Sequence, residues 1–217
     1  MIYNTTAILI ATICMANAAL YVFAEWRDLR SVRAICKLAA SISFIVLAIV
    51  NGAVGTTYGR LILTAFIFSW VGDALLLSLR SSFLLAGIAA FFIAHLAFAT
   101  AFALEDLDVS WLFSALVFLS VAALVLLRWL WKYLGRFYRI AVPVYLTAIT
   151  IMTSLAISAS AASMSPLLAI AAMAFAASDV SVARNRFIGR SIINKAWGLP
   201  LYYAAQLLFA MSVLPHR

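Results

Sequence analysis

Two aspartates lie inside otherwise apolar stretches of this chain, and they are the residues best suited to chemistry. Asp73 lies in FSWVGDALLLSLR, and Asp179 lies in AFAASDVSVARNRF. Each precedes an arginine, Arg80 or Arg186, by seven residues. At about 1.5 Å per residue, both carboxylates are expected roughly 10 Å inside a helix end. Two carboxylates at one depth indicate acid–base catalysis, because desolvation and mutual repulsion can leave one protonated while the other stays anionic.

Other polar side chains accompany them and predict one polar cavity. Ser69 is one helical turn from Asp73, and His95 lies among phenylalanines in FFIAHLAFATAF. Tyr, Gln and His in membrane helices also serve as interhelical contacts, so each alone has a structural interpretation. The candidate catalytic residues are Asp73, Asp179 and His95, and the candidate substrate-binding residues are Lys37, Tyr145, Ser178, Arg184, Arg186, Tyr202, Tyr203 and Gln206.

The composition indicates that these residues are positioned by membrane helices. The chain has 217 residues, of which 67% are hydrophobic and 10% are charged, with a mean hydropathy of +1.13. A soluble domain is typically about 45–50% apolar and about 25% charged. Runs of about 20 apolar residues recur, each long enough to cross a bilayer core of about 30 Å. We therefore expect an all-α integral membrane protein.

The apolar runs predict eight transmembrane helices in a single domain covering residues 1–217. The first segment has no basic region before its apolar stretch, so we interpret it as a permanent helix rather than a cleaved signal peptide. Asp73 and Asp179 fall in the third and seventh segments, which suggests a 4+4 repeat with parallel halves. The expected helices cover residues 5–24, 35–51, 61–79, 83–104, 110–127, 140–158, 166–183 and 196–214.

The basic residues predict how the helices are oriented. Of the 15 Lys and Arg residues, 13 lie in or near the loops after helices one, three, five and seven, while Arg60 and Arg217 lie on the other side. Lys and Arg in short loops mark the cytoplasmic side. Both termini are then outside, the membrane is a bacterial inner membrane, and the cavity opens to the cytoplasm. Membrane orientation explains the net charge of +8 better than a nucleic-acid partner does.

Several chemistries remain open from the residues alone. A histidine-based zinc site is disfavoured because the chain has two histidines and His216 lies in the tail, although an Asp/Asp/His set stays open. We expect no metal and no cofactor. A serine nucleophile could be written from Ser178 or Ser69 with His95, but no strand-to-helix nucleophile elbow is present. Two carboxylates instead suit a reaction through an oxygen-stabilised cation.

Four motifs then point to a known family. VGDALLL, GIAAFFIAHLAFATAF, FAASDVSVARNRF and YYAAQLLFA, in this order, resemble the YhhN family of integral-membrane lysoplasmalogenases. The resemblance extends from about Lys37 to Gln206. The family often has Lys-Pro where this chain has Lys37-Leu38, a departure expected to alter only the entry of the helix. The resemblance implies eight crossings and hydrolysis of the vinyl-ether bond of a lysoplasmalogen to a fatty aldehyde and a glycerophospho-alcohol.

The implied partners are a lysophospholipid substrate and membrane lipids, with the oligomeric state left open. The phosphate is expected among Lys37, Arg184, Arg186 and Lys195. One Asp would protonate the outer vinyl carbon, and the other would stabilise the cation and orient or deprotonate water. Which Asp is the acid stays open at this stage. His95, Tyr145, Tyr203 and Gln206 would orient water or bond the aspartates. The alternatives are a proton-coupled transporter, a lysophospholipase with a serine nucleophile, and a scaffolding bundle that would tolerate leucine at Asp73.

Overall fold

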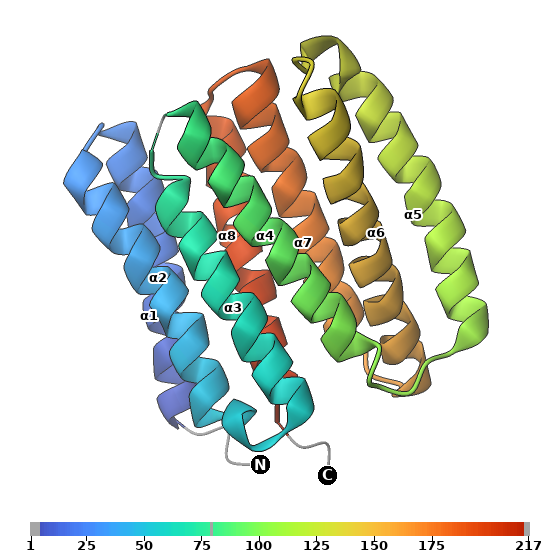
Figure 1. Cartoon of the computed structure of the whole chain (residues 1–217). Helices are drawn as coiled ribbons and strands as arrows, with labels where there is room; N and C mark the ends of the chain where they lie inside the picture. The colour runs from blue at the N-terminus through green and yellow to red at the C-terminus, as the bar shows by residue number, and fades with distance from the viewer. Residues whose placement is uncertain (1–4, 79, 215–217) are drawn as a thin grey trace.

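A computed structural model of the chain describes residues 5–78 and 80–214, and this part contains eight α-helices and no strand (Figure 1). The predicted all-helical fold is confirmed. Leu79, His216 and Arg217, to which the sequence-based expectations also referred, lie outside the described residues. The helices are α1 (Thr5–Trp26), α2 (Arg30–Val50), α3 (Thr57–Leu75), α4 (Ser81–Phe102), α5 (Val109–Leu130), α6 (Tyr138–Ala162), α7 (Leu167–Ala183) and α8 (Ile192–Met211).

Six of the described helices are long and apolar enough to cross a membrane, namely α1, α2, α4, α5, α6 and α7. The α3 and α8 helices are not among the six. Helix α3 carries Asp73, and helix α8 carries three polar residues, Asn194, Lys195 and Gln206. These polar side chains are largely turned into the bundle. Large apolar side chains such as Ile140, which is 72% exposed, and Phe118, which is 70% exposed, cover the outside of the molecule. A surface of this kind suits lipid rather than water, so the chain is a helical membrane protein.

The helices form four antiparallel hairpins that lie side by side, with α5 at one edge (Figure 1). Helices α1, α3, α5 and α7 all finish at the end of the bundle that is uppermost in Figure 1, which we call the basic end. Within the bundle, α8 packs on α7, α1 and α2, and α6 packs on α5, α4 and α7. One feature of this layout agrees with the predicted 4+4 repeat, because α8 meets α2 as α4 meets α6, whereas the packing of α8 on α1 has no equivalent between α4 and α5.

The half of the bundle away from the basic end is filled by phenylalanines. Phe98 and Phe209 have ring centroids 4.6 Å apart, and Phe44 and Phe66 have centroids 4.8 Å apart. Buried aromatic rings in contact with one another therefore fill this half with apolar side chains. The fully buried members of this core are Phe44, Phe66, Phe98, Phe102, Phe175 and Phe209.

Two helix ends differ from the predicted ones and change where site residues lie. The α3 helix ends at Leu75, two residues after Asp73, so the expected depth of about 10 Å is wrong for this carboxylate. The chain leaves the helix because the amides of Leu77 and Ser78 bond carbonyls three residues back, which tightens it into turns. The α2 helix begins at Arg30 rather than residue 35, so Lys37 lies well inside it rather than at its mouth.

Helices α7 and α8 approach closely near the site. A Cβ added at Gly198 would collide with the side chain of Ser181, and the Ser181 hydroxyl donates a hydrogen bond to the carbonyl of Asn194. Glycine is needed at this position because the backbone of α8 lies directly against α7. This contact fixes the helix that carries Asp179 against the helix that carries Tyr202.

Candidate active site

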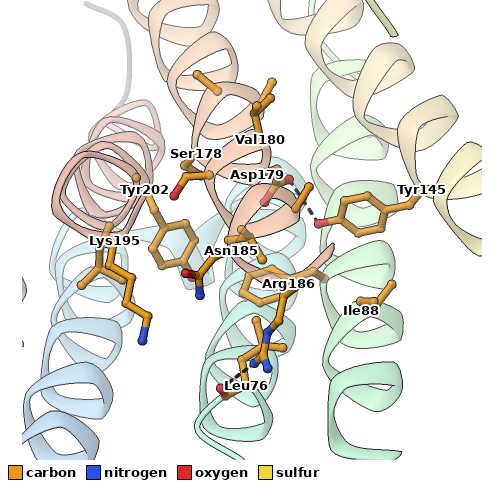
Figure 2. Close-up of a pocket in the computed structure, with 18 of the residues that line it drawn as sticks. Leu76, Ile88, Tyr145, Ser178, Asp179, Val180, Asn185, Arg186, Lys195 and Tyr202 are labelled. Carbon is orange, nitrogen blue, oxygen red and sulfur yellow. Dashed lines mark hydrogen bonds between the residues drawn. The ribbon is translucent and has the colours of Figure 1, made fainter. Parts of the chain in front are cut away.

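A cavity of about 850 Å³ occupies the basic half of the bundle, and side chains from all eight described helices line it. Both Asp73 and Asp179 are on its wall, together with Lys37, Tyr145, Ser178, Arg186 and Tyr202. Figure 2 shows Tyr145, Ser178, Asp179, Arg186 and Tyr202 around this space. The structure therefore brings the two aspartates, which are far apart in the sequence, to one chamber.

Asp73 is buried and surrounded by hydrogen-bond donors. Its Oδ1 lies 3.1 Å from the Lys37 Nζ, and its Oδ2 accepts bonds from Ser41 Oγ at 2.6 Å and from Tyr202 OH at 2.8 Å. Only 2% of Asp73 is exposed. Both oxygens of this carboxyl group therefore have a charged or hydroxyl partner.

A second layer of side chains holds these donors in place. Gln206 Nε2 donates to Tyr202 OH at 3.1 Å, and Tyr203 OH donates to the Lys37 carbonyl at 3.0 Å. Tyr203 OH also lies 3.2 Å from Ser41 Oγ. Tyr203 and Gln206 are fully buried and lie behind the cavity wall rather than on it. In this structure they support the surroundings of Asp73 and do not face the chamber.

Asp179 has a different environment. Tyr145 OH donates to its Oδ2 at 3.2 Å (Figure 2), and His95 Nε2 lies 3.5 Å from the same oxygen. His95 is fully buried, and its ring packs edge-on against Phe175 and Tyr145. Asp179, unlike Asp73, has no lysine or arginine within ion-pair distance among the described residues.

The tautomer of His95 follows from its other nitrogen. Nδ1 lies 2.6 Å from the carbonyl oxygen of Phe91, which can only accept, so Nδ1 carries a hydrogen. In a neutral imidazole Nε2 is then an acceptor, and it faces a carboxyl oxygen. Two acceptors face each other here unless a proton lies between them. His95 Nε2 has no hydrogen-bond donor among the described residues.

The surroundings of the two aspartates correspond helix by helix. Asp73 on α3 receives Lys37 and Ser41 from α2 and Tyr202 from α8. Asp179 on α7 receives Tyr145 from α6 and His95 from α4. Under a 4+4 repeat, α2 corresponds to α6 and α8 corresponds to α4. The correspondence supports the predicted repeat. Lys37 of α2 takes the place that Tyr145 of α6 has in the other half, and Tyr202 of α8 takes the place of His95 of α4.

Charged residues gather where the cavity meets the basic end. Glu25 Oε2 lies 2.7 Å from Arg33 Nη1, and Glu25 Oε1 lies 2.6 Å from Lys195 Nζ. Arg186, on the π-helical turn Arg184–Ile188 after α7, donates from Nη2 to the Leu76 carbonyl at 2.9 Å (Figure 2). Arg186 and Lys195 line the cavity, whereas Arg184 is exposed and lies outside it.

Comparison with known proteins identifies the family of this chain. The model of the YhhN family matches residues 32–213. The chain belongs to the YhhN family. Curated relatives named lysoplasmalogenase, from Mycobacterium bovis and Mycobacterium tuberculosis, are each 34% identical over 156 residues, or 64% of this chain. The chain covers 58% of the length of these relatives. No solved structure matches it.

Sequence-based reasoning missed three residues of this YhhN-family site, Ser41, Glu25 and Arg33. Ser41 is one helical turn from Lys37 on α2, so the spacing of the two polar residues was a usable signal. Arg33 was assigned to a loop because α2 begins earlier than its hydropathy suggests. Lys37, expected to bind phosphate, lines the cavity and also forms an ion pair with Asp73.

The described residues of this YhhN-family chain also bear on the alternative chemistries. They contain no group of three His, Cys, Asp or Glu side chains close enough to hold a metal ion. The Ser178 hydroxyl donates to the Phe175 carbonyl at 2.7 Å, and the Ser69 hydroxyl is buried without a partner in the structure. His95 directs Nε2 toward Asp179 rather than toward either serine. This arrangement differs from that of a serine nucleophile activated by a histidine.

Proposed function

We propose that this chain hydrolyses the vinyl-ether bond of a lysoplasmalogen and releases a fatty aldehyde and a glycerophospho-alcohol. One observation carries the proposal: two carboxylates with opposite hydrogen-bond environments line the same cavity. The lysoplasmalogenase name of the relatives supports the choice of substrate. Vinyl-ether hydrolysis needs a proton donor for carbon and an anion near the cation that results, which matches two carboxylates in different protonation states.

In this proposal Asp73 is the anion. Lys37, Ser41 and Tyr202 all donate to it, and donors favour the charged form of a carboxylate. These groups are held by Tyr203 and Gln206 before substrate arrives. A fixed negative charge costs no reorganisation at the moment when positive charge develops.

Asp179 is the proton donor in this proposal. Its neighbour His95 presents an acceptor nitrogen, and Tyr145 orients the carboxyl group by donating to Oδ2. Asp179 protonates the outer vinyl carbon, which leaves an oxocarbenium ion at the carbon bonded to oxygen. Water adds to this carbon and loses a proton to Asp179, now a carboxylate. The hemiacetal then breaks its bond to the glyceryl oxygen, which takes up the hydroxyl proton, and the acid is restored.

The charged end of the cavity binds the headgroup in this proposal. Among the cations on the cavity wall, Arg186 donates to a carbonyl rather than to a carboxylate, whereas Lys37 and Lys195 face carboxylates. The cavity is also lined by Arg30, Arg33 and Arg190. The Arg186 guanidinium can therefore pair with a lipid phosphate. The excess of Lys and Arg at the basic end orients that end toward the cytoplasm, so substrate enters from the inner leaflet of a bacterial inner membrane and both termini lie outside.

The substrate test compares two lysolipids that differ only at the chain linkage. Purified protein incubated with an alkenyl lysophospholipid should release free aldehyde, and with the acyl analogue it should release little fatty acid. Fatty acid release together with capture by a serine-reactive phosphonate would favour the lysophospholipase alternative. Flux of unchanged substrate across sealed vesicles would favour a transporter. Absence of aldehyde under conditions where the lipid binds would overturn the proposed reaction.

Arg186→Gln is expected to raise the KM for the lysolipid about tenfold or more while kcat changes by less than about threefold. The reason is that a charge-assisted bond to the phosphate contributes about 1.5–3 kcal/mol, mostly to binding. Arg136→Gln is the matched control, because Arg136 is exposed in the α5–α6 connection and does not line the cavity. Initial rates of aldehyde release over a range of substrate concentrations give both constants, and an unchanged KM for Arg186→Gln would contradict this role.

A further inference from the structure

The cavity changes character along its length. Toward α1, α2 and α8 it is lined by charged residues, among them Glu25, Arg33 and Lys195. Asp73 and Asp179 follow, and beyond Tyr145 the lining from α4, α5 and α6 is apolar except for Thr150 and Thr153 of α6. In Figure 1, α1 and α2 stand at one side of the bundle and α5 and α6 at the other, with α3, α4, α7 and α8 between them. An occupant that spans the cavity must be charged at one end and apolar at the other.

The apolar compartment is lined by residues of three helices. Leu84 and Ile88 stand one turn apart on α4, Leu119, Ala123 and Leu126 repeat on one face of α5, and Leu146 faces them from α6. The α5 residues that line the cavity extend from Leu119 to Leu130, or about 16 Å of helix. We define this compartment by these residues and call it the α5 slot.

The α5 helix is placed to enclose something other than protein. Its close packing is with α6, and Ala115 and Leu130 are its buried residues. One face is turned outward, with Leu124 64% and Val125 65% exposed, while the opposite face borders the cavity. A helix that packs on one neighbour and lines an apolar space on the other side leaves room for a hydrocarbon.

We propose that the α5 slot binds the hydrocarbon chain of the lipid substrate and that Ala123 and Leu126 determine which chain lengths are accepted. The inference rests on the proposed function for its substrate. The charged end of the same cavity takes the headgroup, so the bond between headgroup and chain lies beside Asp73 and Asp179. A single chain fits this path, because the cavity offers one apolar compartment leading away from the two acids.

Selection in the α5 slot depends on fit rather than on hydrophobic transfer. A lipid chain that leaves the bilayer for an apolar protein slot exchanges one hydrocarbon environment for another, so the gain per CH₂ is small. A side chain that is too large forces atoms into overlap, whereas one that is too small leaves a void. Replacing a small wall residue such as Ala123 by a larger one, or a large one such as Leu126 by a smaller one, should therefore change the length preference.

The test uses binding of saturated 1-O-alkyl lysophospholipids of increasing chain length, which carry no vinyl bond. Ala123→Trp should weaken stabilisation by the long-chain lipids about tenfold or more and leave short-chain binding nearly unchanged. Leu126→Ala should shift the preference the opposite way, toward longer chains. Val125→Trp is the matched control, since it places the same large side chain on the outward face of α5. Thermal stabilisation of the detergent-purified protein over a lipid titration measures each affinity.

The outcomes separate this inference from the proposed reaction. If the chain-length profiles of Ala123→Trp and Leu126→Ala equal that of Val125→Trp, the slot is not the chain site, whether or not the protein releases aldehyde. If the profiles shift as expected but alkenyl lipid yields no aldehyde, the α5 slot is supported as the chain-binding site and the proposed reaction is contradicted. Aldehyde release measured with the same chain-length series should show the same shifts when both are correct.

Discussion

Asp179→Asn is expected to reduce aldehyde release by about 100-fold to 10,000-fold, the usual contribution of a positioned general acid. Asparagine keeps the size of the side chain and can still accept a hydrogen bond from Tyr145, but it has no acidic proton for the vinyl carbon. The protein should still insert and fold, because Asp179 is partly exposed to the cavity and has no lysine or arginine counter-charge that its loss would leave unpaired. Single-turnover assays with an alkenyl lysophospholipid measure the loss.

The control for this substitution is Asp106→Asn, which makes the same chemical change at an exposed residue between α4 and α5. Its activity should match that of the unaltered protein. Binding of a saturated alkyl analogue to Asp179→Asn should be retained, since the residue acts on the reacting carbon rather than on the chain or the headgroup. Near-normal turnover of Asp179→Asn would exclude Asp179 as the acid and the two-carboxylate mechanism with it.

Asp73→Asn is expected to abolish turnover and also to destabilise the protein, because it leaves the Lys37 ammonium buried without its counter-charge. Loss of one partner of a buried ion pair typically costs about 3–5 kcal/mol. Lys37→Met should destabilise by a similar amount, since it leaves Asp73 with two hydroxyl donors and no cation. Thermal unfolding of the detergent-purified variants, together with aldehyde release, measures both effects.

The double variant Lys37→Met with Asp73→Leu separates the two roles of Asp73. It removes both charges at once, so most of the lost stability should return. Activity should stay absent, because nothing then opposes the positive charge of the oxocarbenium ion. A double variant as unstable as either single variant would show that the pair is not the main contribution of these residues to stability, and an active one would exclude Asp73 from the chemistry.

Together these variants test whether Asp73 and Asp179 have different roles in the proposed reaction. The same side-chain type occurs at corresponding places in the two halves of the bundle, yet one is surrounded by donors and the other faces an acceptor. Differences between the environments of paired carboxylates are what assign acid and base in soluble enzymes. In the proposed mechanism the assignment follows from Lys37 of α2, which pairs with Asp73, and from His95 of α4, which faces Asp179.

The sequence alone was enough to predict a membrane protein of eight helices, six of which are apolar enough to cross a membrane, and the resemblance to the YhhN family, and it singled out Asp73 and Asp179, which line one cavity. Hydropathy runs and short motifs are local properties, so they can be read without knowing how helices face one another. The pairing of Lys37 with Asp73, the supporting positions of Tyr203 and Gln206, the exclusion of Arg184 from the cavity and the exposed edge position of α5 came only from the tertiary structure. Each depends on where a helix ends and how it is rotated, and one residue turns a side chain by about 100° around the helix axis. Such rotations are decided by the packing of all eight described helices together.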